Sequence, residues 1–89
     1  MSQNKIDHGL QICVLERGFI CVGDATVEDG WLTIANAKYV RRWGTKNGLG
    51  ELAANGPLAA TVLDDGGTIK APLGALIHLL QCNEAAWKR

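Results

Sequence analysis

Apolar residues along this chain come in short runs broken by glycine, asparagine and aspartate, a pattern typical of β-strands rather than of long helices. The first run, LQICVL, predicts a strand over about residues 10–16. The next, FICVGDATVE, contains Gly23, and a glycine inside a strand often marks a bulge or bend. Asp29-Gly30 then predicts a tight hairpin that leads into a third strand over about 31–43.

The predicted third strand, WLTIANAKYVRRW, changes its apolar face partway along. Leu32 and Ile34 share one face, whereas from Ala37 onward the apolar residues fall mainly on the opposite parity. Because side chains alternate between the two faces of a strand, this change predicts a bulge or strong bend near Asn36. A strand bent in this way can serve both halves of a closed sheet.

The second half of the chain starts with a break at residues 44–48. LGELAANG then predicts a helix of one to two turns from about Leu49, ended by the Gly-Pro pair at 56–57. Two β-rich runs, LAATVL and GTIKAP, flank Asp-Asp-Gly-Gly at 64–67, and this arrangement predicts a second hairpin.

The C-terminal run LGALIHLLQCNEAAW has two interpretations. Its leucines and isoleucine at helical spacing suit one amphipathic helix. Alternatively, a single turn at 73–76 precedes a last strand over 77–82, and Asn83 caps a short helix, EAAWKR. Pro72 before the run and Gly74 within it weaken the long helix, so we favour the strand.

Length and composition indicate one small globular domain. The chain has 89 residues, of which 47% are apolar, enough for one modest core. Residues 1–9 are mostly polar and are expected to form a flexible lead-in to a single domain over 10–89. The order of elements predicts a mainly β fold, a five-stranded small barrel of the Sm-like or SH3-like type with one short internal helix and a short C-terminal helix. A core this small favours self-association, so we expect a homo-oligomer.

Net charge, targeting signals and cysteine usage limit the partners and the cellular compartment that we expect. Nine basic and nine acidic residues cancel, whereas proteins that bind nucleic acid mainly by charge usually carry a basic excess. The N-terminus lacks the apolar core of a signal peptide, and no apolar run is long enough to cross a bilayer, so no membrane association is expected. Cys13, Cys21 and Cys82 have apolar neighbours and form no C-x-x-C pair, which suits reduced thiols in the cytoplasm.

The stretch GFICVGDATVEDGWLTIANAKYVRRWGTKNGLGELAANG resembles a family of small uncharacterised proteins from phages and bacterial genomes. The resemblance covers about residues 11–87 and implies a phage-related role without known catalytic residues. The matching positions are Asn36-Ala37-Lys38, Tyr39, Trp43, Leu49-Gly50-Glu51-Leu52-Ala53, Gly56 and Cys82.

The strand order is also similar to the Sm/Lsm-like small barrel, whose members bind RNA as rings. TIKAPLGALIHLL resembles the last hairpin, short turn and closing strand of that fold. The Arg-Gly of the second Sm motif is missing, with Gly-Gly-Thr at 66–68 and Lys-Ala at 70–71 instead, and the first motif is not recognisable. The resemblance therefore implies the barrel but not the usual RNA pocket.

NAKYVRRWGTKNG, residues 36–48, has four cations and two aromatic rings and no acidic residue, and we call it the basic-aromatic segment. In one interpretation its cations neutralise the phosphates of RNA or single-stranded DNA while a ring stacks on a base. In the other, which we favour, the rings fill the end of the barrel and acidic residues of the neighbouring strand, Asp24, Glu28 and Asp29, neutralise the cations. Trp, Tyr and Arg are also typical anchors of protein interfaces. The candidate residues for a nucleic acid or a protein partner are Lys38, Tyr39, Arg41, Arg42, Trp43 and Lys46.

Other chemistry has weak support, and neither an enzyme, a metal nor a cofactor is expected. His78 and Cys82 would share one side of a helix, but on a strand they lie about 13 Å apart, too far for one zinc ion. The aspartates at 64–65 suit a turn better than a catalytic pair. Trp87 is expected to hold the terminal helix or to pack on another subunit. The leading hypothesis is a non-catalytic small-barrel protein that acts through oligomerisation or assembly, with RNA or single-stranded DNA binding as the alternative.

Overall fold

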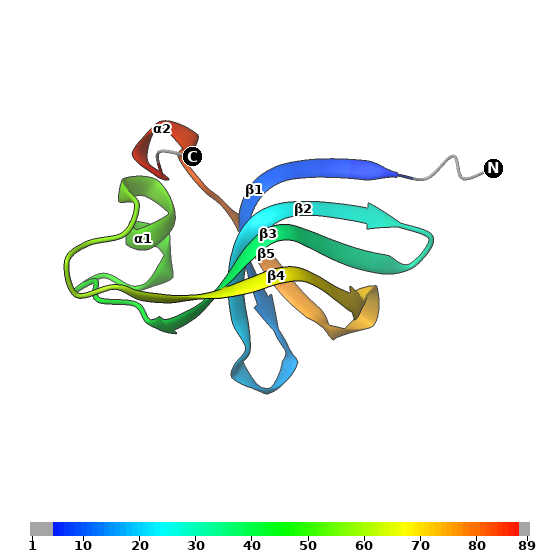
Figure 1. Cartoon of the computed structure of the whole chain (residues 1–89), viewed down its shortest axis with the longest axis horizontal. Helices are drawn as coiled ribbons and strands as arrows, with labels where there is room; N and C mark the ends of the chain where they lie inside the picture. Colours follow the sequence, from blue (N-terminus) through cyan, green and yellow to red (C-terminus); the bar gives the residue numbers. More distant parts are fainter. Residues whose placement is uncertain (1–4, 88–89) are drawn as a thin grey trace.

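Five antiparallel strands form one strongly bent sheet in the computed structural model, which describes residues 5–87 (Figure 1). In spatial order β4-β3-β2-β1-β5, the sheet has β4 and β5 as its two edges. The expected mainly β fold with five strands and two short α-helices is confirmed, but within residues 5–87 the edges do not pair to close a barrel. The elements are β1 (Ile6–Leu15), β2 (Ile20–Glu28), β3 (Trp31–Arg42), α1 (Leu49–Asn55), β4 (Val62–Pro72), β5 (Leu76–Gln81) and α2 (Glu84–Trp87).

The first two hairpins turn on residues with positive φ. Arg17 (φ 65°) and Gly18 (φ 81°) turn β1 into β2, and the N–H of Leu15 donates to the carbonyl of Phe19 at 2.8 Å. Asp29 (φ 53°) and Gly30 (φ 82°) form the predicted hairpin between β2 and β3. β1 begins earlier than predicted, inside the expected lead-in, of which residues 1–4 lie outside the described part of the chain.

The predicted bulge in β3 is confirmed at Asn36. This residue has φ 52°, and the pairing of β2 with β3 shifts register between Val22 and Asp24. The fully buried row of Leu32 and Ile34 continues at Ala37, so the buried face changes parity as the sequence indicates. One extra residue in β3 therefore bends the sheet where β2 and β3 curve in Figure 1.

The hairpin predicted at residues 64–67 is wrong. β4 runs straight through Asp-Asp-Gly-Gly, with Asp64 opposite Tyr39 and Asp65 opposite Lys38. The turn propensity of these residues does not decide the structure, because both aspartates form ion pairs with cations of β3. Gly67 adopts a positive φ of 67° at the register shift opposite the β3 bulge. The residues before Val62 form a loop rather than a strand.

The strand interpretation of the C-terminal run is confirmed. A short 3₁₀ turn (Leu73–Ala75) precedes β5, and α2 follows. The carbonyl of Asn83 accepts hydrogen bonds from the N–H groups of Ala86 (3.0 Å) and Trp87 (3.2 Å), which begins α2 as expected. The last two residues of the predicted helix, 88–89, lie outside the described part of the chain. No helix within residues 5–87 has the length and apolar character needed to cross a bilayer.

Two hydrophobic cores form on opposite faces of the bent sheet. Ile12 pairs with Val22 on one face, and the next pair, Cys13 with Cys21, faces the other way. The first face is covered by α1 and α2, and we call its cluster the helix core: Leu10, Ile12, Val22, Val40, Leu52, Ala53 and Cys82. The second cluster contains only strand residues, and we call it the strand core: Cys13, Leu15, Cys21, Ala25, Leu32, Ile34 and Ala37.

Candidate functional site

Two of the four cations of the basic-aromatic segment are ion-paired with β4. Lys38 Nζ lies 2.6 Å from Asp65 Oδ1, and Arg41 contacts Asp64 through two nitrogens, Nε to Oδ2 at 2.9 Å and Nη2 to Oδ1 at 3.1 Å. The hydrogen bond and charge of Lys38 lower the pKa of Asp65. These two partners, Asp64 and Asp65, come from the stretch predicted to be a turn, and the sequence did not suggest them.

The two aromatic rings of the segment are only partly packed. Tyr39 and Trp43 stay 40% and 41% exposed, so neither ring fills the interior of the sheet. The ring of Tyr39 lies over Gly66 of β4, where a Cβ would approach it to 3.1 Å. Arg42 and Lys46 are exposed on β3 and in the loop before α1. The six candidate residues are thus exposed along the end of β3 and the loop after it, but they do not share one face, since Lys38 lies opposite Val22 of the helix core and Tyr39 opposite Cys21 of the strand core. Half of their positive charge is neutralised by β4.

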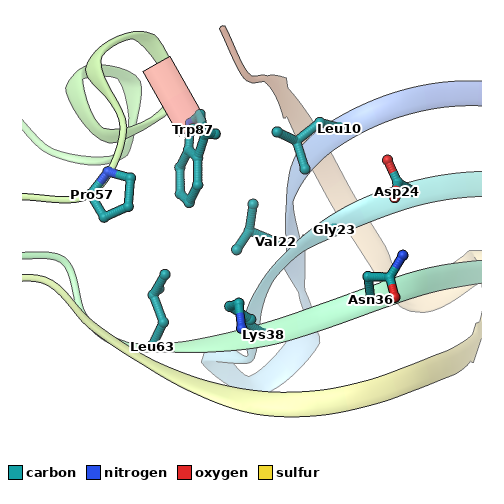
Figure 2. A pocket seen from close by; sticks show the side chains of 9 residues that line it. All are labelled: Leu10, Val22, Gly23, Asp24, Asn36, Lys38, Pro57, Leu63 and Trp87. Carbon is teal, nitrogen blue, oxygen red and sulfur yellow. The ribbon is translucent and has the colours of Figure 1, made fainter. Parts of the chain in front are cut away.

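A hollow of about 530 Å³ opens on the helix side of the sheet, and Lys38 is the candidate residue that lines it (Figure 2). Its apolar end is formed by Trp87, Pro57 and Leu63, and its floor by Leu10, Val22 and Gly23. Its polar end carries Asp24, Asn36 and Lys38. Five elements and the loop after α1 therefore contribute to one concave site.

Local backbone geometry places the residues of this pocket. The bulge turns Asn36 out of the regular alternation of β3, which brings its amide to the polar end of the hollow. Trp87 donates from Nε1 to the carbonyl of Ala53 at 3.1 Å, so the expectation that it holds the terminal helix is confirmed. A smaller hollow of about 270 Å³ adjoins the polar end and shares Asn36 and Lys38 with it.

The sequence identifies some residues of this pocket, but it does not predict that they lie around one cavity. The parity change marks the bulge at Asn36, but it does not say which space the amide enters. Lys38 appears in the basic-aromatic segment, yet its approach to Asp24 and Asn36 depends on the pairing of β2 with β3. Leu63 and Pro57 carry no sequence signal of a site at all.

The structure pairs Cys13 with Cys21 across β1 and β2, but it does not bring His78 to Cys82. His78 is exposed on β5, whereas Cys82 is buried in the helix core. Burial raises the pKa of the Cys13 thiol to about 12, with smaller contributions from Cys21 and Cys82, and it raises that of Cys21 to about 11. These two thiols are therefore poor nucleophiles at neutral pH. Within residues 5–87, no three His, Cys, Asp or Glu side chains lie together as metal ligands would.

Comparisons with known proteins return no match to a family model, to a curated protein or to a solved structure. The resemblance to the phage-related family and to the Sm-like barrel therefore stays a prediction from the sequence.

Proposed function

We propose that this protein works without catalysis of its own, as a small β unit that assembles with copies of itself through the free edge of β5. The observation that supports this proposal is the composition and exposure of β5 at this edge. β5, LIHLLQ, contains no lysine, proline, glycine or acidic residue, and Ile77 is 59% exposed. An apolar edge strand with unpaired backbone groups is a template for pairing with another chain.

The opposite edge of the sheet differs in a way that favours β5. β4 carries Asp64, Asp65 and Lys70, and it ends in Pro72. Charges and proline are the means by which natural sheets block pairing at an edge. A second copy is thus expected to meet β5 rather than β4, and the simplest arrangement is a two-fold dimer in which two β5 strands pair antiparallel.

The small size of the domain supports the same partner. A chain of 89 residues buries a smaller fraction of its surface than a larger domain does, so added burial between copies contributes a large share of its stability. The buried, protonated thiols suit a reducing cytoplasm. A subunit of a phage-related complex is the setting that the sequence resemblance implies.

Light scattering after size exclusion tests the proposal. At micromolar concentration we expect twice the mass of one chain, and Ile77→Lys should return a monomer because a charge on the edge opposes pairing. Thr68→Lys places the same charge on an exposed position of β4 and serves as the matched control. A wild-type protein that is monomeric at micromolar concentration, or a dimer that Ile77→Lys leaves intact, would contradict the proposal.

The two variants also separate a dimer from a ring. In a head-to-tail assembly, β5 of one copy pairs with β4 of the next, which is the ring that the Sm-like resemblance implies and which would close both sheet edges. Both lysine variants should then dissociate the particle, and its mass should exceed that of a dimer. Loss of assembly in Ile77→Lys alone supports the two-fold dimer.

Nucleic-acid binding is the second candidate function, favoured by the exposed rings of Tyr39 and Trp43 beside Arg42 and Lys46. If RNA or single-stranded DNA is the partner, affinity should fall steeply between about 50 and 200 mM salt. Arg42→Ala/Lys46→Ala should flatten that dependence, because these cations are the ones of the segment not paired to Asp64 or Asp65. Absence of oligonucleotide binding at the lower salt concentration argues against this function.

A further inference from the structure

We infer that the hollow between Trp87 and Asn36 is a binding site for a small, flat, amino-substituted heterocycle that carries no negative charge, such as a nucleoside. Its volume of about 530 Å³ lies within the roughly 300–1,000 Å³ of small-molecule sites. An apolar end and a cluster of polar groups at the other end are the usual composition of such a site. The site is separate from the proposed assembly edge, since no residue of β5 lines it.

The apolar end offers a fixed aromatic surface. Trp87 is half-buried, and its hydrogen bond to Ala53 sets the orientation of the indole. Pro57 and Leu63 lie around the same space, facing the ring in Figure 2. A flat ring can stack on such an indole, and stacking of a base on an aromatic side chain contributes roughly 1–3 kcal/mol. This end therefore selects planar ligands.

The polar end offers donors and acceptors in one small region. The amide of Asn36 carries both, and Asp24 carries a carboxylate with several acceptor positions, so it can accept from a ligand in addition to its other interactions. An amino group next to a ring nitrogen matches this set, because the amino group donates to a carboxylate or amide oxygen while the nitrogen accepts from the amide N–H. Amino-bearing bases such as adenine and cytosine have this edge.

The local charges disfavour phosphate. Among residues 5–87, Lys38 is the one cation that lines either hollow, and its Nζ already lies 2.6 Å from Asp65. Asp24 and Asp65 bring two negative charges, so these three side chains sum to about one negative charge. A phosphate would meet two carboxylates and a cation that is already paired. A neutral nucleoside is thus expected to bind better than its monophosphate.

The pocket contains its own reporter. Trp31 and Trp43 are exposed, and replacing them in Trp31→Phe/Trp43→Phe leaves Trp87 as the sole tryptophan of the chain. Adenosine and cytidine are titrated against this protein, with adenosine monophosphate and uridine as comparison probes. We expect adenosine and cytidine to quench Trp87 in a saturable way, and the monophosphate to bind more weakly than adenosine.

Two variants at Asn36 test the polar end. Asn36→Gly removes the amide but tolerates the positive φ of this position, and we expect it to weaken adenosine about tenfold, the effect of one well-formed hydrogen bond. Asn36→Asp keeps the size of the side chain, loses the donor and adds a negative charge, so it should weaken adenosine and weaken the monophosphate still more. Asn47→Gly, an exposed asparagine outside the pocket, is the control.

Asp65 tests the charge argument separately. Asp65→Asn frees the ammonium of Lys38 and should narrow the gap between adenosine and its monophosphate. Failure of all four probes to quench Trp87 saturably overturns the inference. Quenching that Asn36→Gly leaves unchanged also overturns it, because stacking on Trp87 alone would then explain the signal, and so does a monophosphate that binds better than adenosine. None of these results depends on the oligomeric state.

Discussion

The strand core and the helix core pack on opposite faces of one sheet, but their residues are buried from solvent to different degrees. In the strand core, Cys13, Cys21, Ala25, Leu32 and Ile34 are fully buried, and apolar side chains of β2, β4 and β5 pack against the cluster. In the helix core only Ile12 and Leu52 are fully buried. Two residues of the helix core, Leu10 and Val22, line the hollow of about 530 Å³.

The difference follows from what covers each face. The strand core is completed by side chains of the two edge strands, Ile69 of β4 and Leu76 and Leu79 of β5. The helix core is covered by α1 and α2, which have seven and four residues and lie together at one end of the sheet (Figure 1). So short a cover leaves the rest of the face open, and the open part is the candidate ligand pocket. The fold therefore separates a face that stabilises the protein from a face that has room to bind.

The largest expected effect comes from truncating one aliphatic side chain in each core. Ile34→Ala should lower the free energy of unfolding by about 3–5 kcal/mol, because the sealed strand core cannot collapse around the cavity. Leu10→Ala should cost about 1–2 kcal/mol less than that, because its side chain borders space that is already open. Urea unfolding at 25 °C gives both values. Equal losses would mean that the two faces are packed alike.

A smaller effect is expected from adding a methyl group at the bend. At Gly23 a Cβ would lie 2.7 Å from Cγ2 of Ile34 and 2.8 Å from the carbonyl oxygen of Ala35, so Gly23→Ala should destabilise by about 1–3 kcal/mol. Gly50→Ala is the matched control. Nothing lies within 4 Å of a Cβ at Gly50 in α1, and alanine favours the helix by up to about 1 kcal/mol. Thermal unfolding of both variants should shift in opposite directions.

The bend itself was predictable from the sequence, because buried and exposed positions alternate along a strand and apolar and polar residues follow this alternation. Leu32 and Ile34 on one parity and Ala37 on the other require an extra residue between them, and the bulge at Asn36 supplies it. Pro72 and Gly74 likewise indicated that the C-terminal run does not form one long helix. Each of these signals lies within a few residues of the feature that it predicts.

The second hairpin and the pocket were not predictable in the same way. Asp-Asp-Gly-Gly at 64–67 has turn propensity, but Lys38 and Arg41 are more than twenty residues away and hold the aspartates in a strand. The pocket joins Trp87, Pro57 and Asn36 from three distant segments. Sequence patterns report local preference and burial, whereas ion pairs and cavities depend on which strands become neighbours.

The smallest expected effect uses the thiols of the strand core and alkaline pH. Burial raises the pKa of Cys13 to about 12 and that of Cys21 to about 11, whereas in the unfolded chain both ionise near the ordinary value of 9.0. Between these values the unfolded chain loses protons that the folded chain keeps. Stability is therefore full below about pH 8 and falls as the pH rises above 9, with roughly 1.4 kcal/mol lost for each thiol by pH 10 and a further loss toward pH 11.

Variants separate this effect from other groups that titrate at high pH. Urea unfolding at pH 8 and pH 10 should show a smaller loss in Cys13→Ala than in the wild-type protein, whatever the starting stability of the variant. Ile12→Val, in the helix core, removes no thiol and should leave that loss unchanged. Because the strand core is sealed, we also expect a thiol reagent to modify native Cys82 before Cys13 or Cys21, since opening of the short helices is easier than opening of the paired strands. Modification of Cys13 first would show that the strand core opens more readily than its burial implies.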